Sequence, residues 1–255
     1  MEELTLKKWV LITGALGGIG QALVQEFSIA NYNVIATDVR EIGENFEHLD
    51  DIKFLQSDLD KIAQCEIAAT SFHRKVHELT NGQGINALIN NAAIQIVENS
   101  QTLTRQQWNK TLNVNLLAPF YLSQIFVNEL SNNSGSIVNI SSIHATNSKK
   151  DFVAYATSKA ALSALTRNMV LDLGSKVRIN AIEPAAIATE MLKEGFLGRE
   201  EQYRRLEEFH PIGRVGTPSE VAKLAVFLSS ESAGFVQGAC ISASGGIKSC
   251  LSDPS

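Results

Sequence analysis

Cysteines are few in this 255-residue sequence, and the three that occur, Cys65, Cys240 and Cys250, lie far apart. An odd number of separated cysteines without a C-x-x-C pair supports neither a disulfide framework nor a cysteine-based zinc site. We therefore expect ordinary thiols. His73 and His77 have the i, i+4 spacing of zinc-binding helices, but no third ligand follows nearby, so we expect a solvated helix face and no metal site.

Long apolar runs and an excess of positive charge are also absent. No stretch approaches the ~18 apolar residues of a membrane span, and the N-terminal segment MEELTLKKWVLITG does not resemble a signal peptide. The formal net charge of -5 and the pI near 5.6 argue against a protein that binds nucleic-acid phosphates. We expect a cytoplasmic protein whose partner is a small molecule, with neither membrane nor nucleic acid involved.

Internal repeats, low-complexity tracts and proline- or glycine-rich linkers are missing, so nothing marks a domain boundary within residues 1–255. Short apolar runs alternate with segments of helical character, which predicts parallel strands joined by crossover helices. We predict one α/β domain with a doubly wound parallel sheet of seven strands. The predicted strands are WVLIT, NVIATD, IKFLQSD, INALINNA, GSIVNISS, VRINAIEP and ACISAS.

The segment 187–213 departs from this alternation. Its charged helical pattern and its glycines suggest a flap that covers a substrate at the carboxyl edge of the sheet. The alternative, nearly as well supported by pattern alone, is an exposed amphipathic excursion without a role in binding.

The segment VLITGALGGIGQALVQEF has the pattern of a strand, a glycine turn and a helix. Gly14, Gly18 and Gly20 stand where side chains would keep a pyrophosphate away from the helix N-terminus. The second strand ends in Asp38, whose carboxylate can accept hydrogen bonds from the adenosine ribose and would repel a 2′-phosphate. This combination predicts NAD, with NADP less favoured. Two alternatives stay open: Arg40 could compensate a phosphate, and Asp38 could merely begin a turn.

Tyr155 and Lys159 are four residues apart, so a phenol and an ammonium would share one helix face. Alone, this pair is more often solvated than functional. The glycine turn, NNAA at 90–93, a serine pair before a loop, Tyr155-x-x-x-Lys159 and EPAAIATEM, however, occur in one order along the chain. This pattern resembles the short-chain dehydrogenase/reductase family over nearly all 255 residues.

The resemblance implies a Rossmann-type fold with strand order 3-2-1-4-5-6-7, hydride transfer between a nicotinamide and an alcohol or carbonyl, and a homotetramer. It identifies four candidate catalytic residues, Asn115, Ser142, Tyr155 and Lys159. The candidate cofactor-binding residues are Gly14, Leu16, Gly18, Ile19, Gly20, Asp38, Asp58, Leu59, Asn91, Ala92, Tyr155, Lys159, Pro184, Ile187 and Thr189.

Oxidation of an alcohol needs a base, and a tyrosine with its usual pKa near 10 is a poor one at neutral pH. The Lys159 ammonium and a positive nicotinamide would both favour phenolate, so we expect a lowered pKa for Tyr155. Ser142 can donate a hydrogen bond to the substrate oxygen. By the resemblance, Asn115 would hold a water that connects Lys159 to solvent.

The sequence differs from the usual family pattern at three positions: Ala93, Ala185 and Ser244 stand where glycine, glycine and aspartate are common. At Ala93 we expect a small adjustment. At Ala185 the backbone has to avoid a positive φ. The serine at position 244 leaves any contact of that aspartate in question.

The loop after the serine pair carries His144, Lys149 and Lys150 near the carboxyl end of the fifth strand, where α/β sheets bind ligands. The candidate substrate-binding residues are Gln95, Ser142, His144, Lys150 and Tyr155. Such donors resemble the carboxylate-binding side of 3-hydroxybutyrate dehydrogenases and suggest a small, polar, anionic alcohol such as a 3-hydroxy acid. Alternatively, the lysines only solvate the loop and His144 bonds its own backbone.

Two further functions stay open at this point. One is an NADP-dependent carbonyl or 3-oxoacyl thioester reductase, which a cofactor titration would separate from an NAD-dependent enzyme. The other is a catalytically inactive dinucleotide-binding scaffold or sensor, since a fold alone does not determine function.

Overall fold

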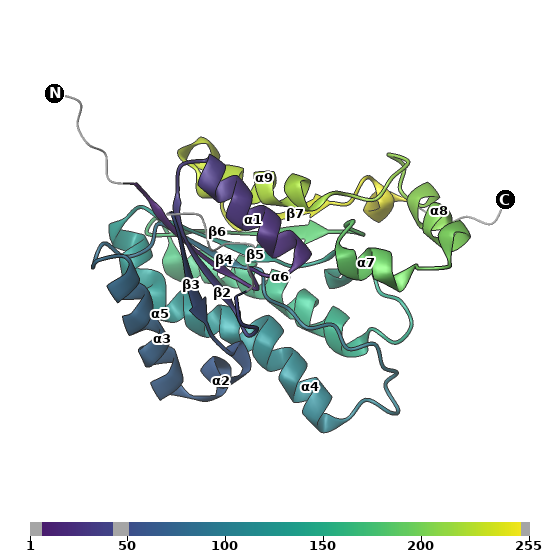
Figure 1. Cartoon of the computed structure of the whole chain (residues 1–255), viewed down its shortest axis with the longest axis horizontal. Coiled ribbons are helices and arrows are strands. Elements are labelled where there is room, and N and C mark those ends of the chain that lie inside the picture. Colours follow the sequence, from purple (N-terminus) through teal and green to yellow (C-terminus); the bar gives the residue numbers. More distant parts are fainter. Residues whose placement is uncertain (1–6, 43–50, 251–255) are drawn as a thin grey trace.

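The computed structural model describes residues 7–42 and 51–250, and seven strands in these ranges form one parallel sheet (Figure 1). The strand order is β3-β2-β1-β4-β5-β6-β7, which confirms the predicted fold class and topology. The strands are β1 (Trp9–Thr13), β2 (Asn33–Asp38), β3 (Ile52–Gln56), β4 (Ala87–Asn90), β5 (Ser136–Ile140), β6 (Arg178–Pro184) and β7 (Cys240–Ala243).

The central strands are buried along their whole length, as the continuous apolar runs require. Every residue of β1, β4 and β5 is buried, because helices cover both faces of the sheet. The register pairs Thr13 with Thr37 and Ile140 with Ile182, so the strands end together at one edge. The segments that follow β1, β4, β5 and β6 therefore meet at this carboxyl edge.

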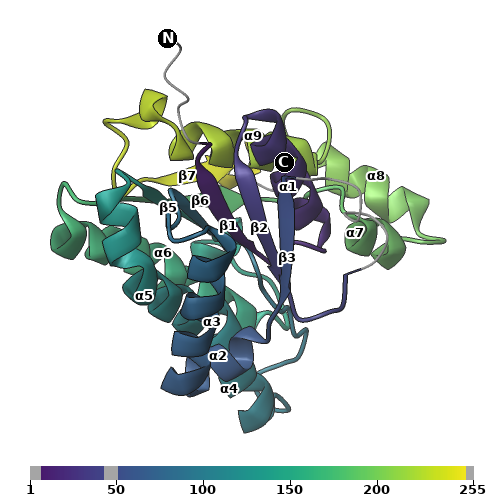
Figure 2. The same ribbon diagram turned by 60° about the vertical axis from the view of Figure 1, so that its left-hand side comes forward.

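Helices form a layer on each face of the sheet (Figures 1 and 2). α1 (Gly18–Ile29) and α9 (Pro218–Ser229) pack against one face, where Phe27 and Leu228 join the first core cluster. α2 (Leu59–Gln64), α3 (Glu66–Leu79), α5 (Ala118–Asn132) and α6 (Val153–Leu173) cover the other face around Phe126. α4 (Arg105–Leu112) continues into α5 through a π-helical turn, η2 (Asn113–Leu117).

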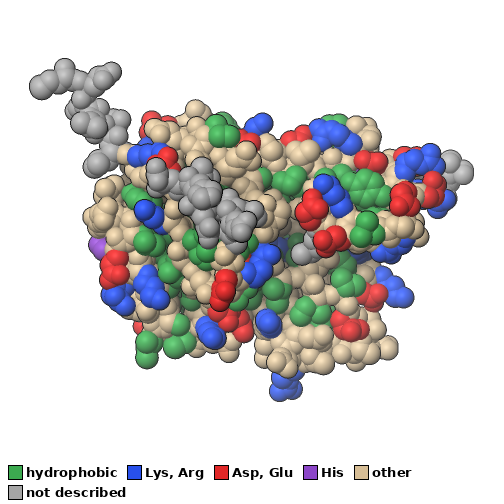
Figure 3. Space-filling view, in the orientation of Figure 1, with side chains coloured by type: hydrophobic (Ala, Val, Ile, Leu, Met, Phe, Trp, Pro, Cys, Tyr) green, Lys and Arg blue, Asp and Glu red, His purple; other side chains and the backbone are tan. Residues whose placement is uncertain are grey.

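The segment 187–213 contains α7 (Glu190–Gly195) and α8 (Glu200–Glu208), which lie side by side at one end of the molecule (Figures 1 and 2). No residue of α8 is buried, and side chains of both charge signs gather over it (Figure 3). Glu201 forms ion pairs with Arg204 and Arg205 within the helix. The expected helical, exposed character is therefore present, whereas closure over a substrate stays a prediction.

The two helical histidines lie on a partly exposed helix face, as expected, and both also contact one carboxylate. His73 Nε2 and His77 Nδ1 lie 2.9 and 3.1 Å from Glu129 Oε1. Within residues 7–42 and 51–250, no group of three or more His, Cys, Asp or Glu side chains is arranged to hold a metal ion. The helices of the same ranges also include none that is long and apolar enough to cross a bilayer.

Candidate active site

The glycine turn between β1 and α1 is tightly packed, which explains the glycines at three of its positions. Gly14 has a φ of +65°, and a Cβ there would lie 2.7 Å from Ala92 Cα. A Cβ on Gly20 would lie 2.0 Å from the Gly14 carbonyl oxygen. At Gly18 it would lie 2.7 Å from the side chain of Thr189, so the turn directly adjoins the segment that follows β6.

The N-terminus of α1 is suited to a pyrophosphate. Its N-cap, Gly17, makes no side-chain capping bond, and the first turn carries no acidic residue. Among the described residues, no side-chain acceptor caps the first amides of this 12-residue helix. Leu16 and Ile19 pack against the first core cluster and fix this turn on the sheet. The donor set fits the phosphates of a dinucleotide.

Asn91 secures the turn from the neighbouring strand. Its side-chain amide donates to the carbonyl oxygens of Thr13 and Gly14 at 2.9 and 3.1 Å. The Thr13 hydroxyl accepts from the amides of Asn91 and Ala92, both at 3.0 Å. The ends of β1 and β4 are thus locked together beside the turn.

Asp38 ends β2 and is bonded on two sides. Its Oδ2 accepts from the Leu16 amide of the glycine turn at 3.1 Å, and Arg40 Nε donates to Oδ1 at 3.0 Å. Burial would raise the pKa of this carboxyl, but the hydrogen bonds from Arg40 and Leu16 outweigh burial and lower it. Asp38 is therefore an ionised acceptor beside the turn, and Arg40 already occupies part of it.

The segment after β6 lies next to the turn. Ala185 keeps a negative φ, so alanine fits here without backbone strain, and its amide donates to Ala243. Pro184 ends the strand, Ile187 forms a bridge to Gly216, and the Thr189 hydroxyl accepts from the Leu192 amide as the N-cap of α7.

On the far side of Asp38, Asp58 caps α2 by accepting from the Asp60 amide at 3.0 Å, and Leu59 is buried behind it. The Asp58 carboxylate has thus a structural bond of its own. Its part in cofactor binding stays a prediction.

Ser142 and Tyr155 come together at the end of β5. Ser142 is buried, and its hydroxyl accepts from the His144 amide at 3.1 Å. Burial raises the pKa of Tyr155, and the nearby Ser142 hydroxyl offsets only part of that rise. Without a bound cofactor, the pKa of Tyr155 is therefore raised and not lowered as expected, because burial of the phenol has the larger effect.

Lys159 lies beneath the tyrosine and is almost wholly buried. Its Nζ is 5.7 Å from the centroid of the Tyr155 ring and donates to the Ile140 carbonyl oxygen at 2.7 Å. Burial lowers the pKa of this ammonium from 10.5 to about 7. The expected helix-face pair is therefore real, with a lysine that titrates near neutrality.

Asn115 lies in the π-helical turn, a feature common at functional sites. Its amide exchanges two bonds of 2.9 Å with the backbone of Ile94 and donates to the Ser158 hydroxyl at 3.0 Å. Ser158 in turn donates to the Tyr155 carbonyl oxygen at 2.7 Å. Asn115 thus contacts the helix turn between Tyr155 and Lys159.

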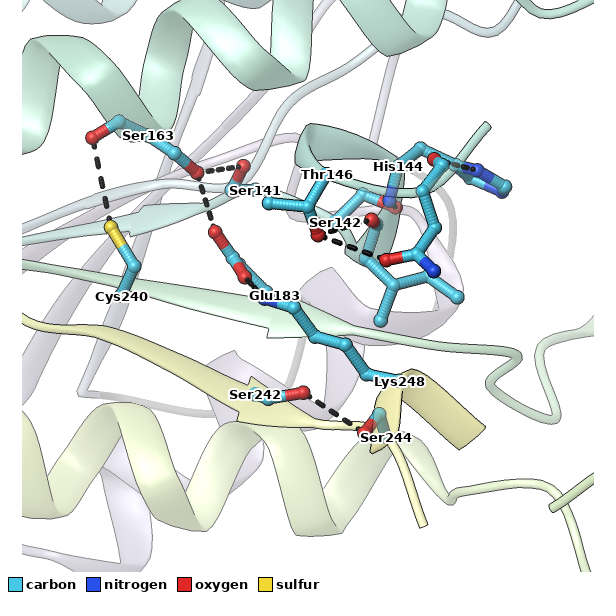
Figure 4. Close-up of polar contacts among 12 residues, drawn as sticks. Ser141, Ser142, His144, Thr146, Ser163, Glu183, Cys240, Ser242, Ser244 and Lys248 are labelled. Carbon is cyan, nitrogen blue, oxygen red and sulfur yellow. Dashed lines mark hydrogen bonds and ion pairs between the residues drawn. The ribbon is translucent and has the colours of Figure 1, made fainter. Parts of the chain in front are cut away.

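The loop after Ser142 forms an aromatic wall beside the tyrosine (Figure 4 shows its polar contacts). The ring centroids of His144 and Phe152 lie 4.9 Å apart, and those of Phe152 and Tyr155 lie 5.8 Å apart. His144 Nδ1 contacts the Asn147 carbonyl at 3.1 Å. The bond to Asn147 would raise the pKa of His144, but burial and the charge of Lys149 outweigh it and lower the pKa. The neutral ring is therefore favoured.

Lys149, rather than Lys150, contacts the aromatic wall of the candidate site. Lys149 Nζ lies 4.1 Å from the centroid of Phe152, and burial lowers its pKa. Lys149, Lys150 and Gln95 are all exposed, and the contact with the Phe152 ring distinguishes Lys149 from the other two. Phe152 had no distinguishing signal in the sequence, although its position three residues before Tyr155 places both on one helix face.

Comparisons with known proteins agree with this geometry. The family model described as Enoyl-(Acyl carrier protein) reductase matches residues 14–248. Protein FixR of Bradyrhizobium diazoefficiens is 37% identical over 251 residues, which cover 94% of this chain and 86% of that protein. The 7alpha-hydroxysteroid dehydrogenase of Escherichia coli K12 is 31% identical over 94% of this chain and 93% of its own.

Solved structures share the fold over their whole length. Ligand-free aldohexose dehydrogenase of Thermoplasma acidophilum has a TM-score of 0.87 at 28% identity and covers 98% of both chains. 4-Hydroxyisoleucine dehydrogenase complexed with NADH has a TM-score of 0.86 at 27% identity, and ElxO with NADP bound has 0.87 at 29%. Each of the two covers 96% of this chain and 100% of its own. The chain therefore belongs to the short-chain dehydrogenase/reductase family and is an NAD(P)-dependent oxidoreductase.

Proposed function

We propose that this protein interconverts a small, anionic secondary alcohol, such as a 3-hydroxy acid, and its ketone, with NAD as the preferred cofactor. The observation that carries the proposal is the meeting of the Ser142 hydroxyl and the Tyr155 phenol above the buried Lys159, at the sheet edge where the glycine turn begins. An acid–base group, an oxyanion donor and a nucleotide-binding turn thus share one site.

Tyr155 is the proposed acid–base group. Because burial raises its pKa, the phenol is protonated at neutral pH and can give its proton to the oxygen of a ketone. Ser142 donates to the same oxygen as negative charge develops. The nicotinamide of a bound cofactor supplies or accepts the hydride.

Lys159 and Asn115 support the tyrosine. Lys159 is held by the Ile140 carbonyl oxygen, and with a pKa of about 7 it can exchange a proton near neutrality. Asn115 holds the intervening turn through Ser158. We propose that Asn115 also anchors a water that connects the lysine to solvent.

Asp38 supports the preference for NAD. Its carboxylate is ionised and stands beside the glycine turn, where it would accept bonds from ribose hydroxyls and repel a 2′-phosphate. Arg40 is bound to this carboxylate, so its charge is partly neutralised and less available to a phosphate.

An anionic substrate is supported by Lys149 on the aromatic wall. Its ammonium lies over Phe152, whose ring in turn packs against Tyr155, so a carboxylate bound there would place an adjacent alcohol near the phenol. His144 favours its neutral form and supplies a hydrogen-bonding ring rather than a charge. Lys150 and Gln95 remain candidates at the rim.

A substrate panel tests the proposal directly. Hydroxy acids, polyols, sugars and hydroxysteroids are offered with NAD⁺ and with NADP⁺, and reduction is followed at 340 nm. We expect the best rate with a hydroxy acid and NAD⁺. Lys149→Ala should lower kcat/KM on that acid by roughly 10- to 100-fold, as for loss of a charge-assisted bond.

The neutral ester of the acid and the variant Lys150→Ala are the controls. Lys149→Ala should change kcat/KM for the ester little, and Lys150→Ala should change kcat/KM for either substrate by no more than about twofold. Equal losses on acid and ester would eliminate the carboxylate role. A preference for NADPH and acyl thioesters would favour the alternative, a 3-oxoacyl thioester reductase.

We further propose a homotetramer, the assembly that the family resemblance implied. Fully exposed Phe235 and the largely exposed Leu171 provide apolar surface for such contacts. Light scattering coupled to size exclusion measures the mass, and a monomer would contradict the proposal.

A further inference from the structure

A buried carboxylate lies behind the candidate site and has no part in the function proposed so far. Glu183, on β6, is only 2% exposed. A carboxylate without compensation is strongly unfavourable in such a place. Its partner is Lys248 of the short 3₁₀ turn η5 (Ile247–Ser249), which forms an ion pair with Glu183 Oε2.

A row of hydroxyls connects this carboxylate to the helix that carries Tyr155. Ser163 Oγ donates to Glu183 Oε1 at 2.9 Å, and the hydroxyls of Ser163 and Ser141 are 2.8 Å apart. Ser141 Oγ also lies 3.0 Å from the carbonyl oxygen of Lys159. Figure 4 shows Glu183 between Lys248 on one side and Ser163 and Ser141 on the other.

The direction of these bonds follows from the number of protons. An ion-paired carboxylate can only accept, so the single proton of Ser163 is committed to Glu183. The contacts between Ser141 and Ser163 and between Ser141 and the Lys159 carbonyl then both depend on the Ser141 proton. The Glu183 carboxylate therefore sets the direction of the Ser163 bond, and the Ser141 proton is shared between the Lys159 carbonyl oxygen and the Ser163 hydroxyl.

The row spans the parts that have to be aligned for catalysis. Ser141 immediately precedes Ser142 at the end of β5. Ser163 lies one turn beyond Lys159 and two turns beyond Tyr155 on the same helix face. A shift of Ser141 against α6 would therefore change the distance between the Ser142 hydroxyl and the phenol.

We propose that Lys248 is a positioning residue for Ser142 and Tyr155, and that it acts through Glu183 and the hydroxyls of Ser163 and Ser141. This inference rests on the proposed function of Ser142 and Tyr155. The ion pair holds the Glu183 carboxylate in place, and the hydroxyl row transmits that position to β5 and α6.

Lys248→Met is the first test. Because small displacements of reacting groups reduce rates strongly, kcat should fall by about tenfold or more. KM and the Kd for NADH, measured by fluorescence, should stay within about twofold, since the glycine turn is untouched. Lys248→Arg restores the ion pair and should restore kcat. Lys8→Met is the matched control, because it removes an exposed ion pair to Glu231 before β1, at the opposite edge of the sheet.

A double-mutant cycle separates positioning from general stability. Ser163→Ala cuts the row but leaves the ion pair, so Lys248→Met should cause no further loss of kcat in that background. If Lys248→Met does not fold, the double variant Glu183→Met/Lys248→Met replaces it. This variant removes both charges of the ion pair and the acceptor of the Ser163 bond, and the same loss of kcat is expected.

Three results would overturn the inference. The first is an unchanged kcat in the Lys248 variant that folds, and the second is a double variant of Lys248→Met and Ser163→Ala in which the two losses of kcat multiply. The third is a lower melting temperature as the sole effect. Tyr155→Phe distinguishes this failure from that of the proposed function. If Tyr155→Phe keeps full activity, the proposed function fails whatever Lys248 does.

Discussion

Asp38 offers the sharpest test of cofactor choice, because the structure shows both what the carboxylate repels and what compensates it. A 2′-phosphate about 4 Å from this carboxylate would be repelled by up to about 4 kcal/mol at an effective dielectric of 20. Arg40 removes part of this penalty, since its guanidinium lies 3.0 Å from the same carboxylate. We therefore expect kcat/KM with NAD to exceed that with NADP by at least tenfold, or about 1.4 kcal/mol.

Replacement of Asp38 should reverse this preference. In Asp38→Ala, the loss of bonds to the ribose should cost roughly 1.5 to 3 kcal/mol with NAD, and the released Arg40 becomes free to bind the phosphate. The Asp38 carboxylate also accepts from the Leu16 amide, so the alanine variant removes a bond that holds the turn. Asp38→Asn is the matched control, because its amide oxygen can still accept from Leu16 while the charge is absent.

Steady-state kinetics with both cofactors measure the effect. The kcat/KM with NADP should rise in both Asp38 variants, and this rise should disappear when Arg40→Ala is added. If Asp38→Asn lowered kcat/KM with NAD and with NADP by the same factor, the carboxylate would support the turn without discriminating against phosphate. That result would refute the reasoning.

Three further predictions concern the catalytic helix and the turn. Tyr155→Phe should lower kcat by about 10²-fold or more while the Kd for NADH changes little, because the lost hydroxyl acts on the substrate proton; more than about a tenth of the activity remaining would exclude that role. Because the pKa of Lys159 falls from 10.5 unfolded to about 7 folded, the unfolded chain binds more protons between these values. Stability should therefore rise by up to about 1.4 kcal/mol per pH unit from pH 7 toward 10 through this group, and urea unfolding of wild type and Lys159→Met at pH 7 and 9 would show a steeper rise in wild type. Gly20→Ala would place a Cβ 2.0 Å from the Gly14 carbonyl oxygen, whereas Gly195→Ala meets nothing within 4 Å; we expect a loss of about 3 kcal/mol or more for the first variant by urea unfolding, and equal stability of the two would contradict the packing argument.

The sheet was predictable because its strands are buried on both faces. A run such as WVLIT, short and continuously apolar, is typical of a parallel strand that is covered by helices on both faces. The glycine turn was predictable for a related reason, because Gly14 and Gly20 occupy positions where a Cβ would collide with backbone atoms. Both signals are local in sequence.

The electrostatic state of the site could not be obtained in this way. The sequence places Lys159 one helix turn from Tyr155, which suggests an ammonium that lowers the pKa of the phenol. Only the packing shows that burial acts on both groups in opposite directions, and raises the pKa of the phenol while lowering that of the ammonium. Proximity along a helix determines which groups meet, whereas burial determines which of their protonation states is favoured.

Contacts between distant segments were equally hidden, and the substrate loop shows why. Lys149 and Lys150 are indistinguishable as neighbours in sequence, and the difference between them arises from Phe152, whose buried ring gives one ammonium a surface to lie on. Glu183 and Lys248 are separated by 65 positions, and neither has a local pattern that predicts an ion pair. We expect residues of this kind to adjust a site whose proposed reaction depends on the glycine turn, Ser142 and Tyr155. Substrate preference and alignment within a family of one fold are therefore expected to depend on such contacts, and these contacts become visible only when the chain is folded.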